Sequence, residues 1–389
     1  MADLSRQSER WWEQFRREMP IASRWAYFDH AAVAPLTGPA AEVLASWCDE
    51  AVRDGATNWA RWARGVEQTR ERAAGLLGAQ PEEVALVPST TAGIHLVAEG
   101  YPWRPGDNVV TLENEFPSNL YPWMNLQSRG VETRRVPLDG GQADPERILE
   151  YCDHRTRMVS VSWVGYATGW RIDLDQLVDL THRRGLLLFV DAIQGLGVFP
   201  LDVRRTPVDF LAADGHKWLL GPEGAGLFFL QRQHLGLLRP LGVGWNSVVQ
   251  RHDFSQIDLA LRDEAARYEG GSQNMAGFLA LGASLELLQQ CGLSCDRSPI
   301  AQRVLELTDL ACVRLRGIGA RIGSPRDGEH RSGIVSFELP GGDPYEIRKR
   351  CLQAGVVLSC RGGRLRISPH AYVNEADIDR LTDALAAAV

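Results

Sequence analysis

The sequence predicts an α/β protein in which a mostly parallel β-sheet is covered by helices on both faces. Over roughly residues 65–235, continuous apolar segments alternate with segments of helical periodicity. Strands without a polar face are typical of parallel sheets that are buried between helices. Of the 389 residues, 44% are hydrophobic and 23% are charged, which allows a large core and excludes a disordered chain.

The N-terminal part is expected to be helical with one extended interruption. Trp11, Trp12 and Phe15 recur at helical spacing and predict a short amphipathic helix. An extended segment, YFDHAAVAPL, follows at residues 27–36. A helical pattern then runs over about residues 40–78 and ends at a glycine, a residue that commonly terminates helices.

Strands and helices alternate through the middle of the chain. Strands are expected, in order, at EVALVPS, DNVVTLEN, RMVSVSWV, LLLFVDA, VDFLAAD and GAGLFFL, with helices beginning at TTAGIHL and DLDQLVD. From about residue 275 a long helical pattern leads into further strands near GIVSFEL, VVLSC and RLRISP. These patterns predict a large domain of residues 25–285 and a small α+β domain of residues 1–24 and 286–389.

The distribution of charge and cysteine limits the partners and the compartment. The formal net charge is −7 without a basic cluster, whereas nucleic-acid surfaces are usually basic. The N-terminus is too polar for a signal peptide, and we find no apolar run long enough to cross a membrane. Seven scattered cysteines argue against a disulfide framework and show no metal-ligand spacing. We therefore expect a cytoplasmic protein without a metal, nucleic-acid or membrane site.

Lysine is rare in this chain. Of the 42 lysine and arginine residues, only Lys217 and Lys349 are lysines. A primary amine can lose its proton and form an imine, whereas a guanidinium cannot. Lys349 lies in a polar helical segment, but Lys217 lies between two apolar runs, where a charge without a function is unusual. Lys217 is therefore the candidate catalytic residue.

Further distinctive residues follow the predicted strands. They are Thr90 and Thr91 after the first strand, Phe116 after the second, Asp191 and Gln194 after the fourth, and Asp214 and His216 after the fifth. In open α/β sheets, ligands bind at the carboxyl ends of the strands. Hydroxyls at a helix N-terminus suit a phosphate, although they also cap helices. Together with a carboxylate, an aromatic ring and an amine, they match the chemical groups of pyridoxal phosphate.

On these motifs the chain resembles the class V aminotransferase group of fold-type I pyridoxal-phosphate enzymes. That group includes cysteine desulfurases, isopenicillin-N-epimerase-like proteins and kynureninases. The matching segments, in chain order, are YFDHAAVAPL, PSTTAGIHLVAEG, ENEFPSNLYPW, SWVGYATGWRIDL, VDAIQGLGVFPLDV, VDFLAADGHKWLLGPEGAGLFFL, YEGGSQN and RLRISPHAYVNEADIDRL. The resemblance implies a seven-stranded-type sheet sandwiched by helices, with a smaller C-terminal α+β domain.

The resemblance also implies how pyridoxal 5'-phosphate would be held. Lys217 would bind its aldehyde as an imine and would act as the general base. Asp191 would pair with the pyridinium nitrogen, and Gln194 would approach the phenolic oxygen. Phe116 stands at the position of the residue that stacks on the ring, which is often histidine in desulfurases.

The phosphate would be held from two subunits. Thr90, Thr91 and His216 match residues that contact it. Asp214 occupies a position that is often serine in the family, and its negative charge would repel a phosphate unless a donor intervenes. Ser272, in YEGGSQN, matches a residue that reaches the phosphate of the partner subunit, so the resemblance implies a homodimer with shared active sites.

The substrate implied by the resemblance is an α-amino acid whose carboxylate is bound by Arg366. The expected reaction is that of a transferase or a C–S lyase of the cysteine-desulfurase type, and the alternative is an isopenicillin-N-epimerase-like epimerase or racemase. Phe116 cannot deliver the second proton that epimerisation needs. Cys360 lies six residues before Arg366 and does not match the nucleophilic loop of desulfurases, so a buried strand cysteine is expected.

Other classes of protein fit the sequence less well. A Rossmann oxidoreductase needs G-x-G-x-x-G after the first strand, and we find no such motif there. A transcriptional regulator needs a basic helix-turn-helix segment, which the N-terminal residues do not supply. A non-catalytic binding protein would have no use for Lys217.

Overall fold

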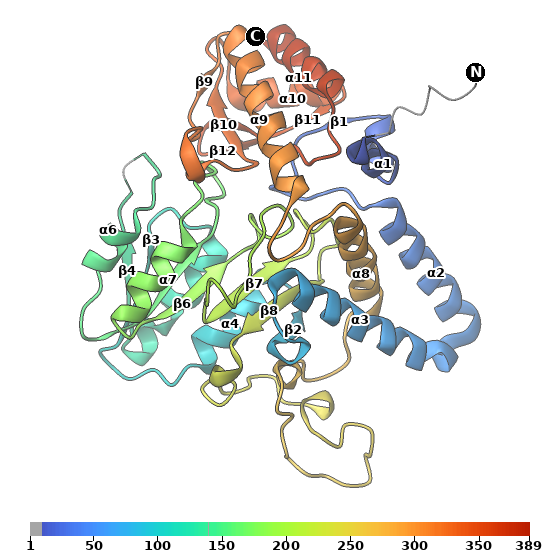
Figure 1. The fold of residues 1–389 in the computed structure, drawn as a ribbon, viewed down its shortest axis with the longest axis vertical. Helices are drawn as coiled ribbons and strands as arrows, with labels where there is room; N and C mark the ends of the chain where they lie inside the picture. Colours follow the sequence, from blue (N-terminus) through green and yellow to red (C-terminus); the bar gives the residue numbers. More distant parts are fainter. Residues whose placement is uncertain (1–9, 139) are drawn as a thin grey trace, which may run out of the picture.

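The computed structural model of the chain describes residues 10–138 and 140–389. Figure 1 shows a large unit built around a central sheet, with a smaller unit, coloured orange to red, at one end. The central sheet has seven strands in the order β2-β8-β7-β6-β5-β3-β4. Their bounds are β2 Val84–Val87, β3 Asn108–Leu112, β4 Glu132–Val136, β5 Thr156–Ser162, β6 Leu187–Asp191, β7 Phe210–Asp214 and β8 Gly226–Leu230.

The sheet is mostly parallel, which confirms the predicted fold class. Only β8 runs against its neighbours β2 and β7, and the other strand pairs are parallel. Strand β4 was not predicted, because its residues ETRRV are mostly polar and only Val136 is buried. Such a composition is typical of an edge strand, and β4 lies at the end of the sheet.

Both faces of the sheet are buried, as the continuous apolar strands predict. In β6, Leu188 and Val190 point into the larger core, whereas Phe189 between them points into a second core with Trp123. Successive residues of a strand point to opposite faces, so both faces must be apolar when both are covered.

Helices cover the sheet and fill the space between the two units. Their bounds are α1 Trp11–Arg17, α2 Gly38–Asp54, α3 Trp59–Leu77, α4 Thr90–Gly100, α5 Tyr121–Met124, α6 Pro145–Glu150, α7 Leu174–Arg183, α8 Met275–Gln290, α9 Pro299–Gly317, α10 Pro344–Gln353 and α11 Glu375–Ala388. The helical pattern over 40–78 is divided between α2 and α3. Gly55, with φ of 58°, ends α2 in a conformation that favours glycine. No helix in the described ranges is long and apolar enough to cross a membrane.

The smaller unit contains a four-stranded sheet in the order β12-β13-β10-β9. The bounds are β9 Arg321–Ile322, β10 Val335–Glu338, β12 Ser359–Arg361 and β13 Arg364–Ile367. A further parallel pair joins β1, Ala26–Tyr27, to β11, Val356–Val357. The predicted division into domains at residues 24/25 and 285/286 remains a proposal. Strand β1 follows the first of these boundaries, although it pairs with a strand of the smaller unit. The predicted N-terminal helix is present as α1, and residues 1–9 lie outside the described residues.

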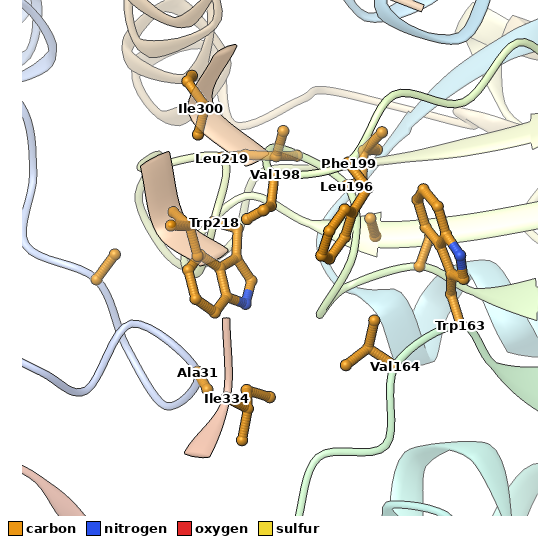
Figure 2. Close-up of a cluster of buried hydrophobic side chains, with 14 of the residues drawn as sticks. Ala31, Trp163, Val164, Leu196, Val198, Phe199, Trp218, Leu219, Ile300 and Ile334 are labelled. Atoms are coloured by element: carbon orange, nitrogen blue, oxygen red, sulfur yellow. The ribbon is translucent and has the colours of Figure 1, made fainter. Parts of the chain in front are cut away.

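Trp218 packs where the two units and the N-terminal segment meet. Figure 2 shows its ring among Ala31 of the N-terminal segment, Val198 of the loop after β6 and Ile334, which precedes β10. The ring is fully buried. Since Trp218 directly follows Lys217, this core also sets the position of the candidate catalytic residue.

Replacing His182 with glutamine should destabilise the protein more at low pH than at high pH. A hydrogen bond of 2.9 Å to Asp209 raises the pKa of His182 above its usual value of 6.5. A group whose pKa is higher in the folded state than in the unfolded state stabilises the fold when it is protonated. This stabilisation is complete below the pKa of the unfolded state and is lost as the pH rises through the pKa of the folded state. We expect the loss in free energy of unfolding to be larger at about pH 5.5 than at about pH 8.5, by less than about 1 kcal/mol because solvent screens this partly exposed pair.

Urea denaturation at the two pH values measures this difference. His154→Gln, at an exposed histidine, is the control. An equal pH dependence in both variants would contradict the role of the His182–Asp209 pair.

Candidate active site

The predicted site residues gather at one edge of the central sheet. Strands β2, β3, β5, β6 and β7 all point in one direction, so their carboxyl ends meet at this edge. Asp191 is the last residue of β6, and Asp214 is the last residue of β7. Thr90 begins α4 shortly after β2.

Lys217 is buried and lacks a hydrogen-bond partner among the described residues. Its exposed fraction is 9%. Burial lowers the pKa of the amine to about 8, with the positive charge of Arg366 acting in the same direction and Asp191 opposing it. The ring centre of Phe116 lies 5.6 Å from Nζ. Such an amine loses its proton far more readily than an ordinary lysine, and its neutral form can act as a nucleophile or base.

The backbone after Lys217 makes a tight turn. The amide of Leu220 donates to the carbonyl of Lys217 at 3.1 Å. Leu220 is the one described non-glycine residue with a positive φ, at 58°. Such backbone strain persists where the surrounding packing imposes it, and it often occurs at functional sites.

Asp191 is a buried carboxylate with an unused oxygen. Its Oδ1 accepts a hydrogen bond from the Ile193 amide at 3.1 Å, and we find no partner for Oδ2 among the described residues. Burial raises the pKa of this carboxyl to about 6, although the charge of Lys217 opposes the shift. A cationic nitrogen against the free oxygen would stabilise the ionised form, which is the role expected for a pyridinium partner.

Gln194 is held in one orientation by two hydrogen bonds. Its Nε2 donates to the carbonyl of Ala31, and its Oε1 accepts from the indole of Trp218, both at 2.9 Å. One N–H of the amide is left for a ligand. The expected contact with a phenolic oxygen therefore stays a prediction that this geometry permits.

The N-terminus of α4 offers donors for an anion. Ser89 caps the helix by accepting from the Ala92 amide at 3.1 Å. Thr90 Oγ1 accepts from the Asp214 amide at 2.9 Å, so its own proton remains available. Thr91 donates to Ser118 at 2.9 Å. Free backbone amides at a helix N-terminus and nearby hydroxyls are the usual elements of a phosphate site.

Asp214 is occupied by its own loop. Its Oδ1 accepts from the Gly215 amide at 2.7 Å, and its Oδ2 lies 3.0 Å from Nδ1 of His216 without hydrogen-bond alignment. The buried Nδ1 of His216 is therefore a polar atom without a hydrogen-bond partner. These contacts offset part of the negative charge that would otherwise repel a phosphate.

Arg366 reaches the site from the smaller unit. It is 1% exposed and donates to Ser359 Oγ at 3.1 Å, to the Tyr166 carbonyl at 2.7 Å and to Asp29 Oδ1 at 3.2 Å. Burial lowers its pKa to about 10, and the nearby carboxylate of Asp29 opposes this shift. A guanidinium has five N–H donors, so two remain for the carboxylate of a substrate.

Two residues that support this arrangement, Glu115 and Asp29, were not among the predicted site residues. Glu115 is buried beside the strand ends, accepts from the Ser162 amide at 2.6 Å and also from the Ser162 hydroxyl. Burial raises its pKa to about 7, and the negative charge of Asp191 adds to the effect. Asp29 lies in the segment YFDHAAVAPL, but only the fold reveals that it meets Arg366.

Two predicted residues lie elsewhere. Ser272 is exposed and lines an open groove of about 740 Å³ together with Trp47, Trp59 and Trp245. Its predicted role concerns a partner subunit and stays a prediction. Cys360 pairs with Leu365 across the hairpin and is buried, so it lies on the face of the small sheet opposite to Ser359 and Arg366.

The arrangement fits the chemical groups of pyridoxal phosphate. The unpartnered Lys217 amine would take the aldehyde, and the free Asp191 oxygen would take the ring nitrogen. The amides at the α4 N-terminus, the hydroxyl of Thr90 and the orphaned Nδ1 of His216 would face the phosphate. Phe116, which is 41% exposed, would supply an aromatic ring for stacking.

The chain belongs to the aminotransferase class-V family, which matches residues 26–381. The resemblance seen in the motifs is therefore confirmed, and with it the pyridoxal 5'-phosphate cofactor of the family. The protein is an enzyme of this class, a pyridoxal-phosphate-dependent transferase or lyase.

Two relatives and one solved structure define its neighbourhood. A probable cysteine desulfurase of Methanothermobacter thermautotrophicus is 31% identical over 96% of this chain and 97% of its own. An isopenicillin N epimerase of Streptomyces clavuligerus is 31% identical over 82% of this chain and 83% of its own. A cystine C–S lyase, solved with its product cysteine persulfide, has a TM-score of 0.88 at 22% identity and covers 95% of this chain and 99% of that chain. The likeness confirms the predicted fold, and the chain is similar to cysteine desulfurases.

The amine of Lys217 should titrate far below an ordinary lysine. Because the chain has only two lysines, Lys349→Arg leaves Lys217 as the single side-chain amine. In the cofactor-free variant we expect acylation of Lys217 by acetic anhydride to rise with a midpoint near pH 8, which burial sets, rather than near 10.5. Peptide mapping by mass spectrometry separates Lys217 from the N-terminal amine. A midpoint near 10.5 in the folded protein would refute the buried environment.

Proposed function

We propose that this protein is a pyridoxal-phosphate-dependent lyase that cleaves the bond between Cβ and sulfur of a cysteine-type amino acid. The observation that carries the proposal is the Lys217 amine, which is buried without a partner between Asp191, Phe116 and Arg366. The similarity to a protein named probable cysteine desulfurase supports the choice of sulfur chemistry.

Each residue of the site has a defined task in this proposal. When bound, the cofactor supplies an electron sink that acidifies the proton on Cα of an attached amino acid. Arg366 binds the α-carboxylate with its two free N–H groups and is held in place by Asp29. Lys217, with a pKa of about 8, accepts the proton from Cα. Asp191 keeps the ring nitrogen protonated through its free oxygen.

The side chains around Lys217 favour elimination over epimerisation. Epimerisation requires a second acid on the face opposite to Lys217, and Phe116 on the ring-stacking side carries no transferable proton. Cys360 faces α10 rather than the site, so the sulfur leaves as sulfide from cysteine or as a persulfide from cystine and is not transferred to this thiol.

Incubation of the holoenzyme with L-cysteine and with L-cystine tests the proposal. We expect pyruvate and ammonia, together with sulfide from L-cysteine or cysteine persulfide from L-cystine; Lys217→Ala should abolish these products and Lys349→Arg should retain them. Asp191→Asn should lower the rate on the order of 10³-fold with the cofactor still bound, because the electron sink is lost. Cys360→Ala should keep the rate. Racemised amino acid without sulfur release would contradict the lyase and support the epimerase alternative.

We propose further that the enzyme is a homodimer with shared active sites. The segment between β8 and α8 extends from the large unit at the end opposite to the small unit (Figure 1) and exposes apolar side chains. Among them are Ile257, which is 95% exposed, Phe254 and Leu259. Apolar surface of this kind commonly marks a protein–protein interface. Ser272 belongs to this segment and lies three residues before α8.

Light scattering should give twice the mass of the chain. The double variant Ile257→Glu, Leu259→Glu should dissociate into monomers, because charges in an apolar interface oppose association. Val52→Glu, at an equally exposed position on α2 outside the segment, is the control. A wild-type monomer with full activity would overturn the dimer.

We also propose a cytoplasmic location. The cysteines are free, and burial raises the pKa values of the three that are buried in the small unit, Cys312, Cys351 and Cys360. Reduced thiols without disulfides are typical of a reducing compartment.

A further inference from the structure

The face of the small sheet that bears Arg366 carries a second arginine directed at the same site. Strands β12 and β13 pair Ser359 with Arg366 and Arg361 with Arg364. Side chains two residues apart on a strand share a face, and so do direct cross-strand partners. Ser359 and Arg361 therefore lie on the face of Arg366, while Cys360 between them points to the other face.

The turn between these strands fixes this register. Gly362 and Gly363 form the two-residue loop with φ of 55° and 75°. Two positive φ values at such a loop are typical of a type I′ hairpin, in which the loop length sets the pairing. A shift by one residue would turn Arg361 away from the site.

Arg361 is the cation on this face that has no acidic partner. Asp29 pairs with Arg366 at 3.2 Å, and Glu338 pairs with Arg364 at 2.8 Å. Arg361 is half-buried, and its one hydrogen bond goes to the carbonyl of its neighbour Cys360 at 2.8 Å. Over the described residues, no carboxylate lies within ion-pair distance of it.

The positive charge of Arg361 influences the ionisation of groups in the candidate site. Its positive charge lowers the pKa of Lys217 and also that of Arg366. Asp29 and the α-carboxylate of a bound amino acid both lie against Arg366 in the proposed arrangement. Neither pairs directly with Arg361, whose remaining N–H groups stay available to a further acceptor.

We propose that Arg361 binds a second carboxylate of the substrate, so that the enzyme prefers amino acids that carry an acidic group in addition to the α-carboxylate. Diagonal neighbours on paired strands lie about 7–8 Å apart, within reach of two long side chains that hold opposite ends of one small molecule. An amino-acid disulfide or a dicarboxylic amino acid has this form. The inference rests on the proposed function, because it assumes that Arg366 takes the α-carboxylate.

Binding of matched amino-acid pairs tests the inference. Dissociation constants are measured from the change in cofactor absorbance for L-glutamate against L-glutamine, L-aspartate against L-asparagine, and L-cystine against the mixed disulfide of L-cysteine with cysteamine. The members of each pair differ in one carboxylate. We expect the acidic member to bind about tenfold or more tightly in at least one pair, as charged hydrogen bonds allow. Arg361→Gln should remove this preference and leave the neutral member unchanged.

Arg364→Gln is the matched control, because its charge is already offset by Glu338 on the same hairpin face. It should keep the preference, whereas Arg366→Gln should weaken binding of both members of a pair. The inference is overturned if wild-type enzyme shows no preference in any pair, or if Arg361→Gln retains it. If acidic and neutral members of every pair bind equally well, the inference fails and the proposed function stands. If none of the six ligands changes the cofactor spectrum, the inference and the proposed function both fail.

Discussion

The packing of Trp218 is the constraint on which the active site depends. Its indole donates to Gln194, and its carbonyl lies 3.3 Å from Nε2 of His370. Burial lowers the pKa of His370 to about 4, and its Nδ1 accepts from the Ala371 amide, so Nε2 carries the proton and donates. The large unit, the N-terminal segment and the small unit thus all pack against Trp218. This packing fixes the backbone next to Lys217, the residue that directly precedes Trp218.

The pKa values of the site residues depend on whether each buried charged group has an opposite charge nearby. Asp191 and Glu115 have raised pKa values because both are buried, and the negative charge of Asp191 raises the pKa of Glu115 further. On the opposite side, Lys217 and Arg366 have lowered pKa values for the same physical reason. A ligand with a cationic ring and anionic groups would pair with the buried carboxylates and with the buried cations. This accounts for a site whose charged groups are incompletely paired within the described chain.

In the proposed function, the small sheet would supply selectivity and the large sheet would supply the groups that act in the reaction. Its hairpin carries Ser359 and Arg361 on one face and Cys360 on the other, so a single register decides which side chains meet the substrate. The thiol faces α10 within the small unit, and Arg361 shares the sheet face of Arg366.

The sequence by itself determined the class of fold and the centre of the site. Unbroken apolar strands indicated a sheet buried on both faces, and a lone lysine after a strand indicated imine chemistry, because both signals are local. Only the tertiary structure decided which residues of the N-terminal and C-terminal segments meet at that centre. Asp29 and Arg366 are 337 positions apart, and their pairing follows from the contact of β1 with β11 and from strand register. The direction of Arg361 likewise depends on hairpin pairing, which is a long-range property that residue types alone do not specify.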